Sequence, residues 1–247
     1  MKTNKIYNID ALEILKELPD NSVDLVLTDP PYEITACDWD KGFIEFLDLY
    51  WKEWLRVGKE NCAFVFTATM KFAVDLICSN RKMFRYDLVW EKANTTGYLD
   101  ANRKPLNAHE NILVFYPKLP TYNPQKVKAK FSKHKRKEKH NYKGYAKHKA
   151  VNTDNKGEAY PKSVLYFSKS VSNSLHPTQK PVDLFRYLIK TYTNENDLVL
   201  DSFMGSGTTA IACIKENRNF VGSELDQEFF EIAKQRIENE QKQTKLF

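Results

Sequence analysis

Short apolar runs alternate with amphipathic stretches along most of the 247-residue chain. The apolar runs are rich in Val, Leu, Ile and Phe and too short for helices, which is typical of buried strands. We expect strands at residues 6–9, 23–27, 62–67, 86–90, 112–116, 197–203 and 220–225. Strands that alternate with helices predict an α/β fold with a mostly parallel sheet and helices on both faces.

The amphipathic stretches predict the helices between these strands. Leu12, Leu15 and Leu18 fall on one helical face, and Asp10 precedes them as an N-cap. Further helices are expected at residues 43–54, 71–78, 181–192, 208–216 and 227–240.

The periodicity is lost between Pro117 and about Ser172, where Lys, Asn, Tyr, Pro and His dominate. The segment from Lys126 to Lys149 contains eleven Lys and Arg residues and one acid, Glu138, so its net charge is +10. The net charge of the whole chain is only +6. The rest of the chain is therefore slightly acidic. We expect a globular body that carries a strongly basic insert.

Other features limit the class of protein. No apolar run approaches the roughly 18 residues of a membrane helix, and the first ten residues lack the apolar core of a signal peptide. The four cysteines are far apart and form no Cys-x-x-Cys pair. This spacing argues against a zinc site or a disulfide framework and predicts a protein of the reducing cytoplasm.

A glycine-rich turn follows the strand expected at 197–203. The run from Gly205 to Ala210, GSGTTA, has the G-x-G-x-x-G/A spacing of nucleoside-binding turns. Glu224, at the end of the next expected strand, stands where an acid holds a ribose hydroxyl. A tight turn without a ligand would use the same glycines. The pattern favours a nucleoside site without naming the nucleoside.

Two further groups narrow the choice of ligand. Asp201 precedes the glycines, where a carboxylate would repel a pyrophosphate but suit a cation. S-adenosylmethionine carries both an α-ammonium and a sulfonium. Upstream, residues 176–181 read HPTQKP, in which Thr178 and Lys180 could bind a carboxylate such as that of methionine. The competing interpretation is a helix entry with Lys180 in solvent.

Residues 29–32, DPPY, end the strand expected at 23–27. Asp29 offers an anionic acceptor, Pro30 offers a carbonyl, and neither proline has an N–H donor. Such a tip suits an amino group that donates two hydrogen bonds, as the exocyclic amine of a nucleobase does. Tyr32 offers a flat face on which a base can stack, worth roughly 1–3 kcal/mol. A simple turn in which Asp29 caps backbone groups is the alternative.

The motifs DPPY, HPTQKP and DSFMGSGTT together resemble the amino-group DNA methyltransferases of the β class, whose motif order is permuted, and specifically the N6-adenine type. The resemblance covers residues 1–118 and 174–240. It implies a Rossmann-like S-adenosylmethionine-dependent methyltransferase fold, circularly permuted. Residues 1–118 would form the target-amine half, 173–247 the cofactor half, and 119–172 a target-recognition insert.

The resemblance also assigns roles. Asp29 and Pro30 would bind the target amine, and Tyr32 would stack on the flipped base. The methionine part of the cofactor would lie against Asp201, Phe203, Gly205 and Gly207, with its carboxylate at Thr178 and Lys180. Glu224 would hold the ribose and Asp10 the adenine. Ser202 and Ser223 depart from the family's usual proline and apolar residue, so somewhat less rigidity is expected there.

The implied enzyme methylates N6 of adenine in double-stranded DNA by base flipping and direct transfer, with S-adenosylmethionine as the only cofactor and no metal. Phosphate contacts are expected from Lys133, Lys135, Arg136 and Lys137 in the insert. A solvated lysine-rich loop is the other interpretation of that segment. Since relatives often pair, a homodimer is expected, and a partner restriction endonuclease is left open. Trp39, beside DPPY, belongs to a candidate lid or to ordinary packing.

Several other functions fit less well. An N4-cytosine methyltransferase would use the same chemistry but more often has Ser at position 29. C5-cytosine enzymes need a Cys after Pro, which this chain lacks. Methyltransferases of protein glutamine or RNA bases usually have Asn at 29 and the glycine motif first. In a nicotinamide dehydrogenase the DPPY motif would have no role. In a non-catalytic DNA-binding protein neither the DPPY motif nor the glycine motif would have one.

Overall fold

The computed structural model describes residues 1–33, 42–131, 133–135, 152–168 and 179–244. Trp39, Arg136, Lys137 and Thr178 lie outside these ranges, so the expectations for them stay predictions. The chain forms two compact units, one from residues 1–123 with 163–247 and one from Pro124–Lys162.

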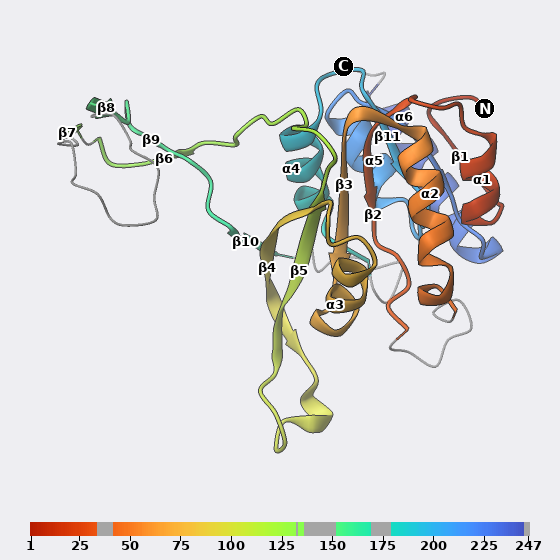
Figure 1. Cartoon of the computed structure of the whole chain (residues 1–247), viewed down its shortest axis with the longest axis horizontal. Coiled ribbons are helices and arrows are strands. Elements are labelled where there is room, and N and C mark those ends of the chain that lie inside the picture. Colours follow the sequence, from red (N-terminus) through yellow and green to blue (C-terminus); the bar gives the residue numbers. More distant parts are fainter. Residues whose placement is uncertain (34–41, 132, 136–151, 169–178, 245–247) are drawn as a thin grey trace. The chain divides into compact units, whose positions relative to one another are not determined.

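The large unit is built on one eight-stranded sheet (Figure 1). Its strands, in spatial order, are β1 (Lys5–Tyr7), β12 (Asn219–Ser223), β11 (Leu198–Asp201), β2 (Val23–Thr28), β3 (Gly58–Ala68), β5 (Asn107–Phe115), β4 (Phe84–Thr96) and β10 (Val164–Phe167). Every neighbouring pair is parallel except the two pairs that involve β5. The expected α/β fold with a mostly parallel sheet is confirmed.

Six α-helices of the described chain flank the sheet: α1 (Ala11–Glu17), α2 (Leu47–Val57), α3 (Met70–Ser79), α4 (Val182–Tyr192), α5 (Thr208–Lys215) and α6 (Gln227–Thr244). A short 3-10 turn, η2 (Ile44–Phe46), leads into α2. Asp10 accepts a hydrogen bond from the Leu12 amide at 2.8 Å, which confirms it as the N-cap of α1.

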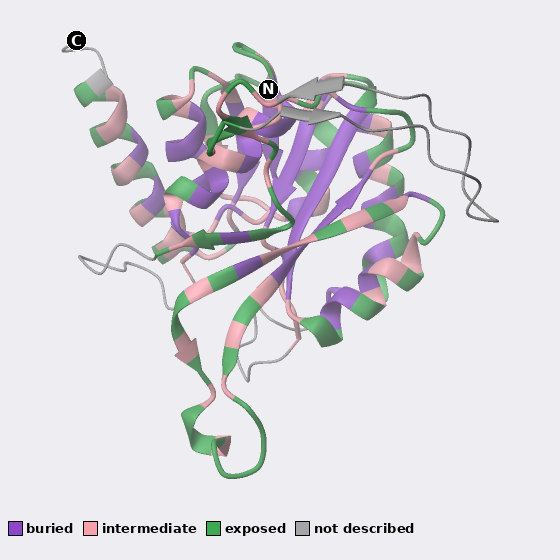
Figure 2. Cartoon of the chain, turned by 90° about the vertical axis from the view of Figure 1, so that its left-hand side faces the viewer, coloured by how far each residue is buried: buried purple, intermediate pink, exposed green. Residues whose placement is uncertain are grey.

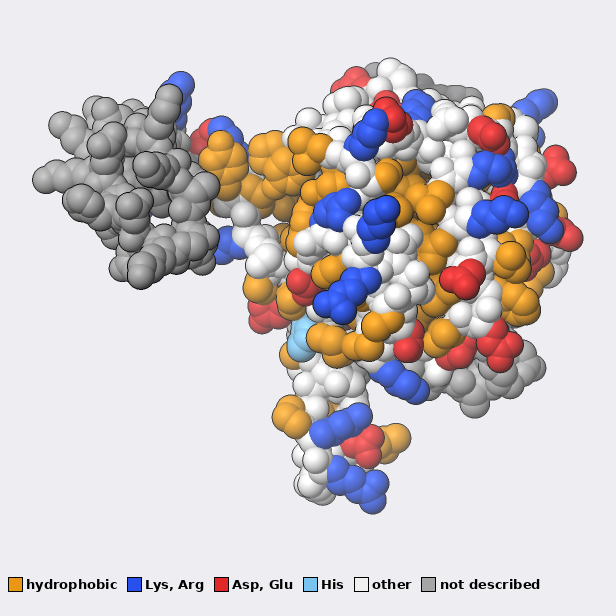
Figure 3. Space-filling view, viewed as in Figure 1, with side chains coloured by type: hydrophobic (Ala, Val, Ile, Leu, Met, Phe, Trp, Pro, Cys, Tyr) orange, Lys and Arg blue, Asp and Glu red, His pale blue; other side chains and the backbone are white. Residues whose placement is uncertain are grey.

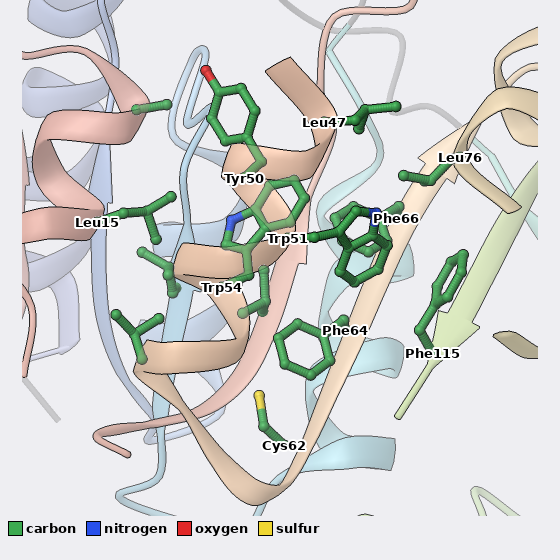
Figure 4. Close-up of a cluster of buried hydrophobic side chains, with 14 of the residues drawn as sticks. Leu15, Leu47, Tyr50, Trp51, Trp54, Cys62, Phe64, Phe66, Leu76 and Phe115 are labelled. Atoms are coloured by element: carbon green, nitrogen blue, oxygen red, sulfur yellow. The ribbon is translucent and has the colours of Figure 1, made fainter. Parts of the chain in front are cut away.

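Successive strand residues supply two separate cores, because side chains alternate between the faces of a sheet. Val26, Phe64 and Phe66 pack with α1, α2 and α3 in an aromatic-rich core around Trp51 and Trp54 (Figure 4). The alternate residues of the same strands, such as Leu25 and Val65, pack with α4 and α5 on the other face. The central strands are therefore buried on both sides (Figure 2).

Two features of the large unit differ from the predictions. Strands β4 and β5 form a hairpin longer than the runs 86–90 and 112–116 on which they were predicted. Strand β10 lies within the segment assigned to the basic insert, yet it pairs with β4, for example Leu165 with Trp90. The compact small unit is therefore shorter than the expected insert 119–172, because Val164–Phe167 completes the sheet.

The small unit contains two short antiparallel pairs. Strand β6 (Val127–Lys128) pairs with β9 (Glu158–Ala159), and β7 (Lys133–Lys135) pairs with β8 (Asn152–Asp154). Lys126 forms an ion pair with Glu158 at 3.0 Å. Among the helices described in either unit, none has the length and apolar character needed to cross a membrane.

Candidate active site

Four neighbouring strands each bring a carboxylate to the same edge of the sheet. Asp10 follows β1, Glu224 follows β12, Asp201 ends β11, and Asp29 follows β2. These strands are parallel, so their carboxyl ends meet at one edge, where open α/β sheets bind ligands. All four acids line one cavity of about 950 Å³. The structure thus brings the DPPY motif, from the first part of the chain, and the glycine-rich turn, from the last part, to one cavity.

Asp29 is held by three donors. The hydroxyls of Tyr32 and Thr67 donate to its Oδ1, and the Lys180 ammonium donates to Oδ2 at 2.7 Å. None of these partners is a backbone amide, so Asp29 does not act as the cap of a simple turn. Pro30, which follows it, is buried and also lines the cavity.

Lys180 is only 6% exposed, so it does not point into solvent as one interpretation of HPTQKP required. Its ammonium also lies 3.3 Å from Glu110, which in turn lies 3.5 Å from Lys92. Burial alone would lower the pKa of Lys180, but the carboxylates of Asp29 and Glu110 outweigh burial and raise it. Lys180 is therefore a charged partner of Asp29 in this structure.

Tyr32 contributes both its hydroxyl and its ring. The ring stacks on Phe72 with centroids 5.2 Å apart, and the Lys180 ammonium lies 5.3 Å from its centroid. Burial, followed by the nearby charge of Asp29, raises the pKa of the phenol, so the hydroxyl stays a donor at neutral pH. The ring is thus fixed beside Asp29 in the cavity wall.

Asp201 is almost completely buried and links three elements. Its carboxylate accepts hydrogen bonds from the Thr28 hydroxyl at 2.6 Å, the Thr209 hydroxyl of α5 and the Phe203 amide at 3.0 Å. Burial raises its pKa to about 6, and the three donors only partly offset that effect. Asp201 therefore organises the loop between β11 and α5 as well as lining the cavity.

Glu224 supports the glycine turn directly. The Gly205 amide donates to its Oε2 at 2.7 Å, and the Asp226 amide donates to Oε1 at 2.9 Å. Burial raises the pKa of Glu224 above its ordinary value. Apart from its chain neighbours, no residue that the structure describes has an atom within 4 Å of the place a Cβ would take at Gly205, which has a φ of +52°.

Two glycines serve packing. Gly207, at the start of α5, does not line the cavity, and a Cβ there would lie 3.2 Å from the Cβ of Ala233 in α6. At Gly222 a Cβ would lie 2.4 Å from the Asp201 carbonyl oxygen, a distance no side chain tolerates. Gly222 lets β12 approach β11 closely beneath the site, a requirement that the sequence analysis did not identify.

The two serines that depart from the family pattern are both hydrogen-bonded. Trp54 donates its indole N–H to the Ser202 hydroxyl at 3.1 Å, and the Ser223 hydroxyl donates to the Ser202 carbonyl at 2.9 Å. Both residues are buried. These hydrogen bonds connect the loop after β11 to α2 and β12. They restrict the loop at the position where the family usually has a proline.

Two residues near Asp29 were missed by the sequence analysis. Thr67 lies near the end of β3, beside β2, and Glu110 lies on β5 just before its buried half. Thr67 could have been found from the sequence, because it is a polar residue at the end of a predicted strand. Glu110 could not, because its proximity to Lys180 depends on the pairing of β5 with β3.

Known proteins resemble this chain over most of its length. A sequence model of the DNA methylase family matches residues 23–235. The Type II methyltransferase M.BglII of Bacillus subtilis is 32% identical over 96% of this chain and 69% of its own length. The Type II methyltransferase M1.MboII of Moraxella bovis is 30% identical over 94% and 96%. The DNA adenine methyltransferase YhdJ of Escherichia coli is 29% identical over 94% and 82%.

The chain belongs to the DNA methylase family. Solved structures agree. M1.HpyAVI in complex with SAM superposes on this methylase with a TM-score of 0.64 and 26% identity, over 94% of this chain and 98% of that one. The cytosine-N4-specific PvuII DNA methyltransferase gives a TM-score of 0.70 with 19% identity, over 97% and 92%, which shows the shared fold alone. The expected methyltransferase fold is therefore confirmed.

The methylase takes its methyl group from S-adenosylmethionine. Its cavity suits that cofactor in size, since sites for ligands of this kind measure roughly 300–1,000 Å³. Acidic side chains complement the ammonium and sulfonium, and Phe203, Leu225 and Phe229 supply apolar wall. The open space at the Gly205 Cβ position leaves its backbone accessible.

Asp201→Asn is expected to change how stability depends on pH. The pKa of Asp201 is about 6 in the fold against an ordinary value of 3.8, so the folded state holds the proton more tightly and loses stability as pH rises through this window. Relative to the native protein, the variant should gain about 2 kcal/mol between pH 4 and pH 7, since part of the effect falls below pH 4. Urea unfolding of the cofactor-free protein at both pH values measures this gain. The matched change Asp48→Asn, on the exposed face of α2, should give none.

Proposed function

We propose that this DNA methylase transfers a methyl group from S-adenosylmethionine to N6 of adenine in double-stranded DNA, at a specific site, with the base flipped out of the helix and the transfer direct. The observation that carries the proposal is the position of Asp29 and Pro30. They line the same cavity as the three other strand-end acids, so an acceptor for an amine lies beside acids suited to a cationic cofactor.

The proposed role of Asp29 is to accept a hydrogen bond from the target amine. An ionised carboxylate has about four acceptor positions, and Tyr32, Thr67 and Lys180 fill three of them. One position remains, and the Pro30 carbonyl provides a second acceptor. Two acceptors on the amine hydrogens hold the nitrogen so that its lone pair faces the methyl group, which the bound cofactor supplies as an electrophile.

In the same proposal Lys180 acts on Asp29. Its ammonium fixes the orientation of the carboxylate, because the ion pair is only 2.7 Å long and Lys180 is itself buried. The resemblance to the family instead gave Lys180 the methionine carboxylate. The 2.7 Å contact favours the role at Asp29, and the two roles predict different effects of substitution.

The remaining acids are proposed to bind the cofactor. Glu224 would hold the ribose, and Asp10, at the far end of the row of strands, would hold the adenine. Asp201, Phe203 and Gly205 would flank the methionine part, and Gly207 would shape the turn by packing on α6. The order β1, β12, β11, β2 places these residues in a row that ends at Asp29, which suits a ligand that lies along the sheet edge.

Adenine is proposed over cytosine on the residue at position 29. Asp is typical of the N6-adenine members that the sequence resembles, whereas N4-cytosine members more often have Ser. The relative YhdJ is named as an adenine methyltransferase. N4-cytosine methylation is the alternative, since both bases present an exocyclic amine and PvuII DNA methyltransferase, which is cytosine-N4-specific, shares the fold.

The basic insert is proposed to contact the DNA phosphates. Lys133 and Lys135 lie on β7, and the proposal extends to Arg136 and Lys137. Each phosphate neutralised should add about −0.9 to the slope of log affinity against log salt. We also propose that the methylase pairs as a homodimer, on the likeness to its relatives alone.

Chromatography of nucleosides tests the base assignment. DNA that lacks methylated bases is incubated with the enzyme and S-adenosylmethionine, digested and analysed, and sequencing of the product maps the site. The proposal predicts N6-methyladenine, and Asp29→Ala enzyme is the control for contaminating activity. N4-methylcytosine would establish the alternative, and the absence of any methylated nucleoside would indicate a non-catalytic DNA-binding protein.

A further inference from the structure

The hairpin of β4 and β5 continues well beyond the core of the sheet (Figure 1). None of the residues between Trp90 and Asn111 is buried, whereas both of these residues are. The strands stay paired at Thr96 and Asn107, so the outer half is a formed hairpin. It lies outside the apolar core, so its side chains are available to a binding partner.

The tip of this hairpin holds two large apolar side chains in solvent. After Gly97, at a φ of +91°, the 3-10 turn η3 (Tyr98–Asp100) exposes Tyr98 by 68% and Leu99 completely. The turn is ordered by its own bonds. The Arg103 amide donates to the Asp100 carbonyl at 2.8 Å, and the hydroxyls of Thr95 and Tyr98 lie 2.8 Å apart.

Cations accompany these apolar groups. Arg103 and Lys104 are exposed beside the turn, and each lies 3.8 Å from Asp100. Figure 3 shows charged and apolar side chains together at the free end of the hairpin. Surface pairs of this length hold their partners weakly, so both cations are free to take phosphate oxygens.

The hairpin is continuous with the active site. Lys92, Asn94, Thr96 and the segment 104–107 line the same cavity as Asp29 and Tyr32. A base held at Asp29 would therefore lie beside the inner part of the hairpin, and we expect the duplex that delivers it to reach the tip.

Extrusion of a base costs a few kcal/mol and leaves a gap in the stack, which apolar side chains of DNA-binding proteins fill as wedges. We propose that the tip of the β4–β5 hairpin is a DNA-contact surface, with Tyr98 and Leu99 entering the space that the flipped base vacates and Arg103 and Lys104 on the flanking phosphates. This inference rests on the proposed methylation of a flipped base in duplex DNA, and it holds for adenine and for cytosine alike.

Tyr98→Ala and Leu99→Ala, singly and together, test the wedge. The substrates are two oligonucleotide duplexes that carry the mapped site, one with the target base paired and one with an abasic position opposite it. The double variant should lose at least about 10-fold in kcat/KM on the paired duplex. The loss should shrink to about threefold or less on the abasic duplex, where less stacking and pairing has to be broken.

Controls separate this result from misfolding and from failure of the proposed function. Calorimetric affinity for S-adenosylmethionine should be unchanged, and Leu49→Ala, at a leucine of α2 that is 48% exposed, should have no effect. An equal loss on both duplexes, or no loss, would overturn the wedge. Failure of the proposed function would appear in the native enzyme as absent methylation.

The cations give a second readout. Replacement of Arg103 and Lys104 by alanine should weaken DNA binding and reduce the slope of log affinity against log salt by up to about 2. An unchanged slope of log affinity against log salt would show that Arg103 and Lys104 do not contact the phosphates.

Discussion

Asp29→Ala is expected to lower kcat for methyl transfer by at least about 100-fold, because it removes an acceptor that orients the target amine. The variant should fold, since the Lys180 ammonium keeps Glu110 as a partner 3.3 Å away. Affinity for S-adenosylmethionine should change by less than about 1 kcal/mol, since the other strand-end acids remain. Single-turnover methylation and calorimetry measure the two quantities separately.

The control for Asp29 is another aspartate of the same unit. Asp75→Ala, on α3, removes a carboxylate that is only partly buried and should leave methylation unchanged. If Asp29→Ala enzyme turned over at the native rate, the amine-binding role would be wrong. If it lost cofactor binding instead, Asp29 would belong to the cofactor site.

Lys180→Met is expected to reduce kcat by about 10-fold or more while affinity for S-adenosylmethionine stays within about threefold. The change leaves the carboxylates of Asp29 and Glu110 without the cation that both contact, so Asp29 loses the donor that holds its Oδ2. Single-turnover rates at saturating cofactor and calorimetry measure the two quantities.

The opposite pattern would support the role that the family resemblance gave to Lys180. Loss of a charge-assisted bond to the methionine carboxylate would weaken cofactor binding by roughly 10- to 100-fold and leave kcat at saturating cofactor close to the native value. Lys190→Met, at a lysine on the last turn of α4, is the matched control and should alter neither quantity.

The central part of the fold was predictable because its strands are buried on both faces. Runs such as 23–27 and 62–67 are apolar except for Asp24 and Thr67, and their strands β2 and β3 form as expected. The outer part was not predictable in the same way. Strand β10 is a run of only four apolar residues, Val164–Phe167, within a polar segment at the sheet edge, and so short a run does not predict its pairing with β4.

The site was predictable where function depends on strand ends. Asp29, Asp201 and Glu224 follow apolar runs, and parallel pairing alone brings such residues to one edge. Their partners depend on contacts over long sequence separations. Lys180 meets Asp29 across 151 residues, and sequence patterns carry no information on which of two acceptors a lysine reaches.

The outer half of the β4–β5 hairpin was also not predictable from the sequence. The strand residues beyond Trp90 and Asn111 are mostly polar and none is buried, so the pattern ends the predicted strands near these positions. Backbone pairing continues to Thr96 and Asn107 without a hydrophobic signal. A strand segment that buries no apolar side chain carries no signal that an analysis based on burial can detect.

A crystal structure of the methylase with an S-adenosylmethionine analogue and a duplex that carries the mapped site would test the central claim directly. We predict that the cofactor analogue occupies the row from Asp10 to Asp201, and that the exocyclic amine of the flipped base lies within hydrogen-bond distance of the Asp29 carboxylate and the Pro30 carbonyl. A flipped base whose amine contacts neither group, or a cofactor bound away from these strand ends, would contradict it.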